Sequence, residues 1–210
     1  MCCEKMISEH SIAKVLDNKD KYSSYTTYLR RYNQAKKSEF YLECLWILYA
    51  MLEDRTSSLL YYIGFTSSKK RNSATGSKKI KTQIRDILEM NKPNEKYRFD
   101  TMSGKLERIQ QVLVWSSSKS NEDIPYKTAI KAAFLPLTDN EELSIVLSYL
   151  NDEWRDKRNQ LTHALFNKKP DAVASELQAL VENGYKAVRV FDAAVREIKK
   201  HDIRGKYRIQ

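Results

Sequence analysis

Apolar residues recur along most of the chain at the three- and four-residue spacing of an α-helix. Residues 21–63 are expected to be helical, with a break near residues 36–38. The central stretch, residues 40–52, is apolar almost all the way round, which predicts a long helix through the middle of the domain. Gly64 then favours a helix end, and residues 66–78 predict an exposed, basic loop.

The second half of the chain repeats the helical pattern in shorter pieces. Helices are expected over residues 79–90, 103–116, 126–134 (ending before Pro136) and 170–200. Between the last two, Asp139 with Glu142 three residues on predicts a capping box that opens a helix to about residue 165.

Helix breakers are scarce, with 4 prolines and 5 glycines in 210 residues. We therefore expect an all-α protein, a single-domain helical bundle over residues 21–201 with a long central helix. An N-terminal segment, residues 1–20, would precede this bundle, and a basic tail, residues 202–210, would follow it.

Basic residues outnumber acidic ones by 37 to 27, giving a net charge of +10. Such an excess attracts polyanions, so nucleic acid and acidic proteins are the candidate partners, although a merely soluble basic protein is equally compatible. A basic cluster has two readings, a solvated loop and helix start or a phosphate-contacting RNA-binding patch. Its members are Lys69, Lys70, Arg71, Lys78, Lys79 and Lys81.

Three cysteines, Cys2, Cys3 and Cys44, form neither a disulfide framework nor a metal clip, which favours a reducing compartment. The first ten residues lack the apolar run of a signal peptide, and residues 40–52 are too short to cross a bilayer. We expect a cytoplasmic protein without a membrane partner. The three histidines and unclustered acids also predict no metal site and no cofactor.

One helix carries the candidate chemistry. Its inner stripe is expected to contain Leu143, Leu147, Leu150, Trp154, Leu161 and Leu165. Arg158 falls on this stripe where an apolar residue is expected, and Arg155, Asn159, Thr162 and His163 form a polar arc beside it. A guanidinium at the edge of a core requires a carboxylate, a phosphate or water.

Two acids of residues 40–54 could supply the carboxylate. Glu43 and Asp54 share one face of the expected central helix, and either could orient Arg158 or Arg155. Alternatively, Glu43 pairs with another base, such as Lys36 or Arg85, or faces water.

Residues 158–163 read R-N-x-x-x-H on a helix. This string resembles the motif of the HEPN family (higher eukaryotes and prokaryotes nucleotide-binding domains), and its place before a final long helix resembles that family's arrangement. The resemblance implies a metal-independent endoribonuclease in a defence or toxin context, with Arg158 and His163 catalytic and Asn159 orienting. It also implies a homodimer and a cognate antitoxin or regulatory partner. Leu165 stands where one variant of the family has a modified tyrosine, so that mode of silencing is not expected here.

The residue chemistry agrees with this interpretation. Histidine, with a reference pKa of about 6.5, exchanges protons near neutral pH, and arginine binds a phosphate through two hydrogen bonds. Residues five apart on a helix lie about 140° around the axis and about 7.5 Å along it. Convergence of Arg158 and His163 therefore requires a loosened helix, a reaching arginine or a second copy across a dimer interface, and we favour the dimer.

Other interpretations remain. His163 taken alone is better explained as a surface histidine near a helix end, and only Arg158 and Asn159 beside it favour the catalytic interpretation. As a whole, the chain could be a non-catalytic helical module that binds RNA, a nucleotide or a protein. A DNA-binding role is weaker, because no recognition helix is apparent.

Overall fold

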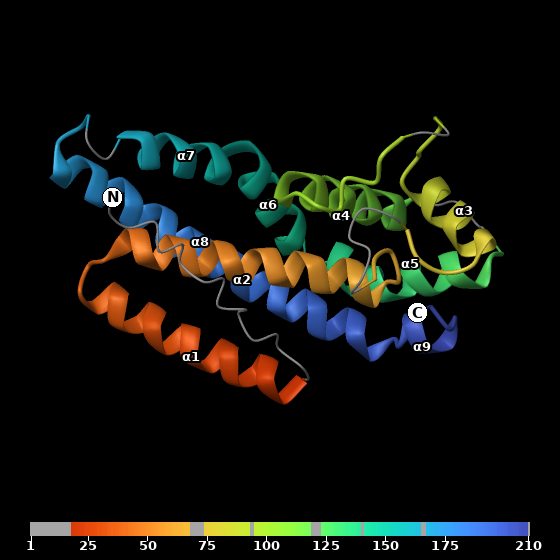
Figure 1. Cartoon of the computed structure of the whole chain (residues 1–210). Coiled ribbons are helices and arrows are strands. Elements are labelled where there is room, and N and C mark those ends of the chain that lie inside the picture. Colours follow the sequence, from red (N-terminus) through yellow and green to blue (C-terminus); the bar gives the residue numbers. More distant parts are fainter. Residues whose placement is uncertain are drawn as a thin grey trace, which may run out of the picture. The chain divides into compact units, whose positions relative to one another are not determined.

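A computed structural model describes residues 18–67, 74–92, 95–118, 123–139, 141–164 and 167–209 (Figure 1). Most of these residues are helical and none forms a β-strand, so the prediction of an all-α protein is confirmed. The chain divides into two compact units, residues 1–40 and 41–210. The division falls between the first two helices, further along than the expected end of the N-terminal segment at residue 20.

The first unit contains α1 (Asn18–Lys37). The helix ends where the backbone of Glu39 turns into the left-handed region, with a φ of 59°. The amide of Phe40 then donates to the carbonyl of Ala35 at 2.8 Å, a hydrogen bond that closes the helix end. The expected break near residues 36–38 is confirmed.

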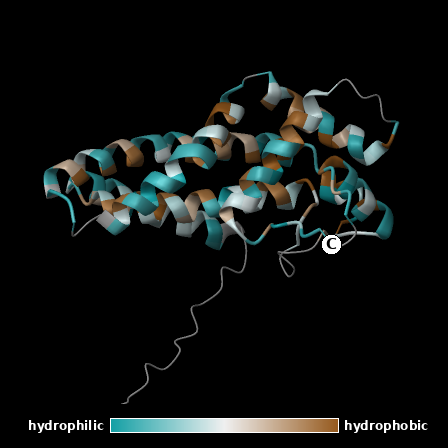
Figure 2. Cartoon of the chain, turned by 90° about the horizontal axis from the view of Figure 1, so that it is seen from above, coloured by the Kyte–Doolittle hydropathy of each residue, from teal (hydrophilic) through white to brown (hydrophobic). Residues whose placement is uncertain are grey.

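The second unit holds the remaining helices. In chain order they are α2 (Tyr41–Tyr62), α3 (Lys78–Ile87), α4 (Met102–Ser117), α5 (Pro125–Thr138), α6 (Glu142–Tyr149), a π-helical segment η1 (Leu150–Trp154), α7 (Arg155–Ala164), α8 (Pro170–Lys200) and α9 (Ile203–Lys206). Figure 2 shows hydrophobic and hydrophilic residues alternating along these ribbons, as expected for amphipathic helices.

The core of this unit forms around α2 and α8, which run side by side (Figure 1). Leu48 and Leu52 of α2 and Val181 and Phe191 of α8 are completely buried. Burial of such side chains stabilises the folded chain by roughly 1.5–3 kcal/mol each. The apolar run of residues 40–52 therefore forms the predicted central helix.

The end of α2 is closed by Gly64, which has a φ of 83°. Its amide donates to the Tyr61 carbonyl at 2.9 Å, and the amide of Phe65 reaches back to Leu60 at the same distance. This pair of bonds is the Schellman arrangement, in which glycine is favoured because it lacks a Cβ. The predicted cap is confirmed.

The C-terminal residues pack against this same cap. Ile203 and Ile209 are buried, and Ile209 lies so close to Gly64 that a Cβ there would meet its side chain. Arg204 donates through Nη1 to the carbonyls of Tyr61 at 3.1 Å and Thr66 at 2.7 Å. The expected basic tail is therefore integrated into the fold.

Two expectations around residue 136 are wrong. Pro136 lies inside α5, two residues before its end, where it cannot donate the amide hydrogen bond that a helix residue gives to the carbonyl four positions earlier. Asp139 is the C-cap of α5, with its amide on the Leu135 carbonyl at 3.2 Å, and is not an N-cap. The next helix begins instead after Glu141, which adopts a left-handed conformation with a φ of 50°.

The expected continuous helix over residues 139–165 is divided by the π-helical segment η1. Its inner stripe is nevertheless buried as predicted, at Leu143, Leu147, Leu150, Trp154 and Leu161. The last expected member, Leu165, lies outside the described residues. A π-helical turn inserts an extra residue per turn and often occurs at functional sites.

Within the described part of the chain, every helix is too short or too polar to traverse a bilayer.

Candidate functional site

The R-N-x-x-x-H string lies on α7, immediately after the π-helical segment. Arg158 stands between Trp154 and Leu161 on the inner stripe, and both of these neighbours are 2% exposed. Arg158 itself is half-buried, so its side chain takes the place of a core residue and carries its charge toward α2.

The guanidinium of Arg158 lies over the ring of Tyr49 on α2. Its Cζ atom is 4.2 Å from the centre of that ring and 6.0 Å from the centre of the Trp154 ring. The electron-rich faces of both rings attract the cation. Two aromatic residues thus fix the side of α7 on which the positive charge is presented.

Trp154 supports this arrangement from the core. Its ring stacks with that of Tyr49, with centroids 6.5 Å apart and planes within 6°. Its indole Nε1 donates to the carbonyl of Leu180 at 2.9 Å, which satisfies a buried donor. On α8, the missing side chain of Gly184 makes room, because a Cβ there would lie 3.1 Å from that same nitrogen.

The polar partner of Arg158 is its neighbour Asn159. The Oδ1 atom of Asn159 accepts hydrogen bonds from Nη2 at 2.8 Å and from Nε at 3.3 Å. Thr162 is held by its own helix, since Oγ1 donates to the Arg158 carbonyl at 2.8 Å. Asn159 therefore fixes the arginine, whereas the sequence suggested that it would orient the histidine.

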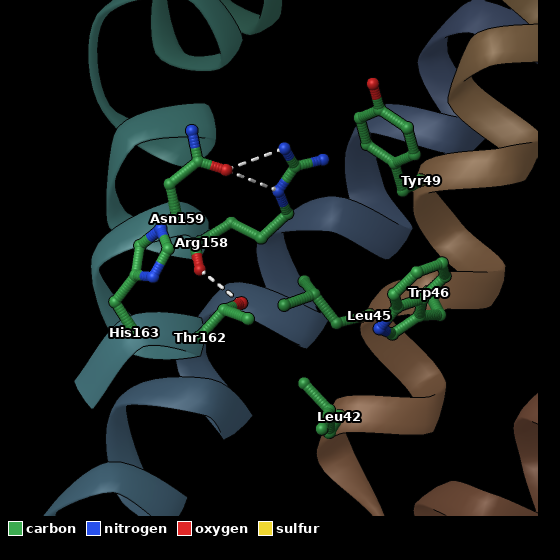
Figure 3. A pocket seen from close by; sticks show the side chains of 8 residues that line it. All are labelled: Leu42, Leu45, Trp46, Tyr49, Arg158, Asn159, Thr162 and His163. Carbon is green, nitrogen blue, oxygen red and sulfur yellow. Dashed lines mark hydrogen bonds between the residues drawn. The ribbon is translucent and has the colours of Figure 1, made fainter. Parts of the chain in front are cut away.

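A pocket of about 260 Å³ opens between α7 and the first half of α2. α7 contributes Arg158, Asn159, Thr162 and His163, and α2 contributes Leu42, Leu45, Trp46 and Tyr49 (Figure 3). The guanidinium reaches toward Tyr49, while the imidazole of His163 lies on the other side of the pocket, beside Asn159 (Figure 3). The helix thus brings both predicted catalytic residues to one pocket. The guanidinium and the imidazole, however, point away from each other.

The other predicted supporting residues lie elsewhere. Arg155 pairs with the adjacent Asp156 at 3.3 Å, and Asp54 pairs with the adjacent Arg55 at 3.0 Å. Glu43 is half-buried on α2 and does not line the pocket. Asn159 therefore contacts Arg158, and Asp156 contacts Arg155, where Glu43 or Asp54 was expected.

The predicted basic patch is only partly described. Lys78, Lys79 and Lys81 are exposed at the start of α3, whereas Lys69, Lys70 and Arg71 lie outside the described residues. Figure 1 shows α3 near the C-terminal end of α2, while the pocket lies against its N-terminal half. The three lysines therefore do not line the pocket.

Sequence reasoning missed Tyr49 and Trp46, the two aromatic residues of the pocket. Both were assigned to a core helix, although Trp46 is 71% exposed. Their spacing of three residues does place both rings on neighbouring positions of one helix face, and this was the available signal.

The described residues contain no group of three or more His, Cys, Asp or Glu side chains placed to hold a metal ion. A comparison with known proteins gave no match to a protein-family model, a curated protein or a solved structure.

Proposed function

We propose that the chain is a metal-independent endoribonuclease of the HEPN type. The observation that carries this proposal is the shared pocket of Arg158, Asn159, Thr162 and His163, four of the six residues of the R-N-x-x-x-H string. A pocket that joins a fixed cation to an exposed imidazole supplies the two groups needed for cleavage of RNA by its own 2′-hydroxyl.

The proposed chemistry divides between these groups. The 2′-oxygen attacks phosphorus, the bond to the 5′-oxygen breaks, and a 2′,3′-cyclic phosphate and a 5′-hydroxyl form. His163 accepts the proton of the 2′-hydroxyl or donates one to the departing 5′-oxygen. Arg158 stabilises the negative charge that grows on the non-bridging oxygens, because a guanidinium remains protonated and matches a phosphate with two donors.

A single copy of the pocket supplies one imidazole, and its ring lies apart from the guanidinium (Figure 3). A homodimer that joins two pockets across a two-fold axis would supply a second His163 and so provide both an acid and a base. The remaining parts of the proposal follow from the motif's resemblance: a cytoplasmic defence or toxin role, and restraint by an antitoxin or another regulatory partner.

The test is cleavage of single-stranded RNA by the purified chain, with and without EDTA. We expect cleavage in both conditions, products with 2′,3′-cyclic phosphate ends, and loss of cleavage in Arg158→Ala and His163→Ala. Arg196→Ala and His201→Ala are matched controls: Arg196 is a 79% exposed residue of α8, and His201 is the residue that caps it. Intact RNA after incubation with wild-type protein contradicts the proposal, and so does equal activity of the motif and control variants.

A non-catalytic RNA- or nucleotide-binding module is the second candidate. The aromatic lining of the pocket favours it, because stacking surfaces and one cation suffice to bind a nucleotide. In that case the wild-type chain binds RNA without cutting it, and Arg158→Ala weakens binding whereas His163→Ala has little effect.

A further inference from the structure

Trp46 is an exposed aromatic residue within the most apolar helix of the chain. The residue is 71% exposed, although its neighbours Leu45 and Ile47 are only 1% and 8% exposed. An exposed apolar residue is unremarkable by itself. Trp46, however, forms part of the pocket wall opposite Arg158 and His163 (Figure 3).

The two aromatic rings of the pocket have different surroundings. Tyr49 already contacts two partners, since the Arg158 guanidinium lies 4.2 Å from its ring centre and the ring of Trp154 stacks at 6.5 Å. Its exposed fraction is intermediate, whereas most of the Trp46 surface faces solvent. Trp46 is therefore the ring of this pocket that is open to a planar ligand.

The chemistry beside Trp46 indicates which planar ligand fits. A base attached to a phosphate needs an aromatic face and a nearby cation, and the pocket contains both in Trp46 and Arg158. With a volume of about 260 Å³, the pocket has room for a single base.

We propose that Trp46 is a substrate-binding residue whose indole stacks on one unpaired RNA base while Arg158 contacts the adjoining phosphate. This inference rests on the proposed ribonuclease function and adds a specificity residue to it. A paired base is stacked between its neighbours and leaves no face for the indole, so Trp46 discriminates against duplex RNA. Because every base has a stacking face, it contributes little choice among the four bases.

The experiment measures binding of a single-stranded oligonucleotide that carries 2′-O-methyl groups and so resists cleavage. We expect Trp46→Ala to raise its Kd by about 5- to 140-fold, because stacking one base contributes roughly 1–3 kcal/mol and 1.4 kcal/mol corresponds to tenfold in Kd. Trp46→Phe, which retains a ring, is expected to keep most of the affinity. Phe40→Ala is the matched control, since Phe40 is 64% exposed and does not line the pocket.

An abasic series identifies stacking itself. Each oligonucleotide of the series lacks the base at one position. We expect the wild type to bind one member of the series more weakly than the others, namely the one that lacks the stacked base. Trp46→Ala should bind that oligonucleotide no more weakly than the wild type does. A Kd for Trp46→Ala equal to that of the wild type overturns the inference, as does a deficit that is the same with every abasic oligonucleotide. Trp46→Ala could also convert a dimer to a monomer and weaken binding equally for every abasic oligonucleotide. That result would show that Trp46 contacts a second copy of the chain and not a base, and it would overturn the inference.

Cleavage assays separate this inference from the proposed function. If the wild type cuts RNA and Trp46→Ala binds normally, the stacking role fails and the ribonuclease function stands. If the wild type binds but never cuts, and the abasic series still identifies one stacked base, the stacking role stands and the ribonuclease function fails.

Discussion

The guanidinium of Arg158 lies 4.2 Å from the centre of the Tyr49 ring, and this contact joins α7 to α2 at the candidate site. The two residues are far apart in the sequence, and the rigid stack of Tyr49 on Trp154 gives the arginine a fixed support. A cation held in this way loses less conformational entropy when it binds a phosphate than a freely rotating one does.

Removal of the Tyr49 ring should weaken the proposed ribonuclease activity. We expect Tyr49→Leu to lower kcat/KM for RNA about 2- to 30-fold, because a cation–π contact contributes roughly 0.5–2 kcal/mol. Tyr49→Phe keeps the ring and should stay close to wild type. Steady-state cleavage kinetics check this, with thermal unfolding to confirm that both variants fold. Equal losses in the two variants would show that the hydroxyl matters and the ring face does not.

Gly184 should resist replacement even by alanine. A Cβ at this position would lie 3.1 Å from Nε1 and 3.2 Å from Cζ2 of Trp154. Overpacking a core costs roughly 1–3 kcal/mol, while alanine gains roughly 1 kcal/mol of helix propensity. We expect Gly184→Ala to lower the free energy of unfolding by about 1 kcal/mol in urea titrations. Ser175→Ala, at an exposed position of α8, should be neutral or stabilising, and a stabilised Gly184→Ala would contradict the packing argument.

Tyr126 should make stability depend on alkaline pH. Burial raises its pKa above the ordinary value of 10.0, and its hydroxyl donates to the Ile63 carbonyl at 2.8 Å. The folded state therefore favours the neutral phenol. This preference stabilises the folded chain fully at a pH below the pKa that Tyr126 has in the unfolded chain, and the stabilisation is lost as the pH rises above that pKa.

The variant Tyr126→Phe removes both the hydrogen bond and the titration. Near neutral pH we expect it to be less stable than the wild type by about 1 kcal/mol. That difference should shrink as the pH rises above about 10, where only the wild-type unfolded state ionises at this position. Urea unfolding between about pH 8 and pH 11 measures it. Parallel stability curves for the two proteins would contradict the assignment.

Arg204 should anchor the C-terminal residues to the end of α2. Its Nη1 atom bonds the carbonyls of Tyr61 and Thr66, and its Cζ atom lies 3.9 Å from the Tyr61 ring centre. We expect Arg204→Ala to lower the free energy of unfolding by about 1.5–3 kcal/mol, since hydrogen bonds from charged donors are the stronger class. Lys206→Ala, an exposed basic residue of the same short helix, is the control. An equal loss in both variants would assign the effect to charge alone.

The lysines of α3 distinguish a phosphate-contacting patch from a solvated helix start. If Lys78, Lys79 and Lys81 each contact an RNA phosphate, alanine at all three positions should reduce the slope of log K against log salt by about 2. A control variant removes Lys186, Arg189 and Arg196, which are exposed on α8, and so loses the same charge. Equal slopes for the α3 variant and the wild type would favour the solvated interpretation.

Most helices and much of the core could be predicted from sequence, because their causes are local. The apolar spacing in residues 143–161 reports which side of the helix is buried, whatever packs against it. The Gly64 cap is also local, since its hydrogen bonds join residues within one turn. Pro136 and Asp139 were misassigned because neither residue marks one boundary by itself. A proline near a helix end and an acid between two helices are each compatible with more than one helix boundary.

The candidate site divides in the same way. The sequence by itself determined that one helix carries Arg158, Asn159, Thr162 and His163 on neighbouring positions, because helical spacing alone sets that arrangement. Only the tertiary structure decided that Asn159 and Tyr49, and not Glu43 or Asp54, contact Arg158. It also decided that Trp46 is exposed beside them. Those outcomes depend on how α2 and α7 pack, and packing is set by the shapes of side chains that are distant in the chain and meet only on folding.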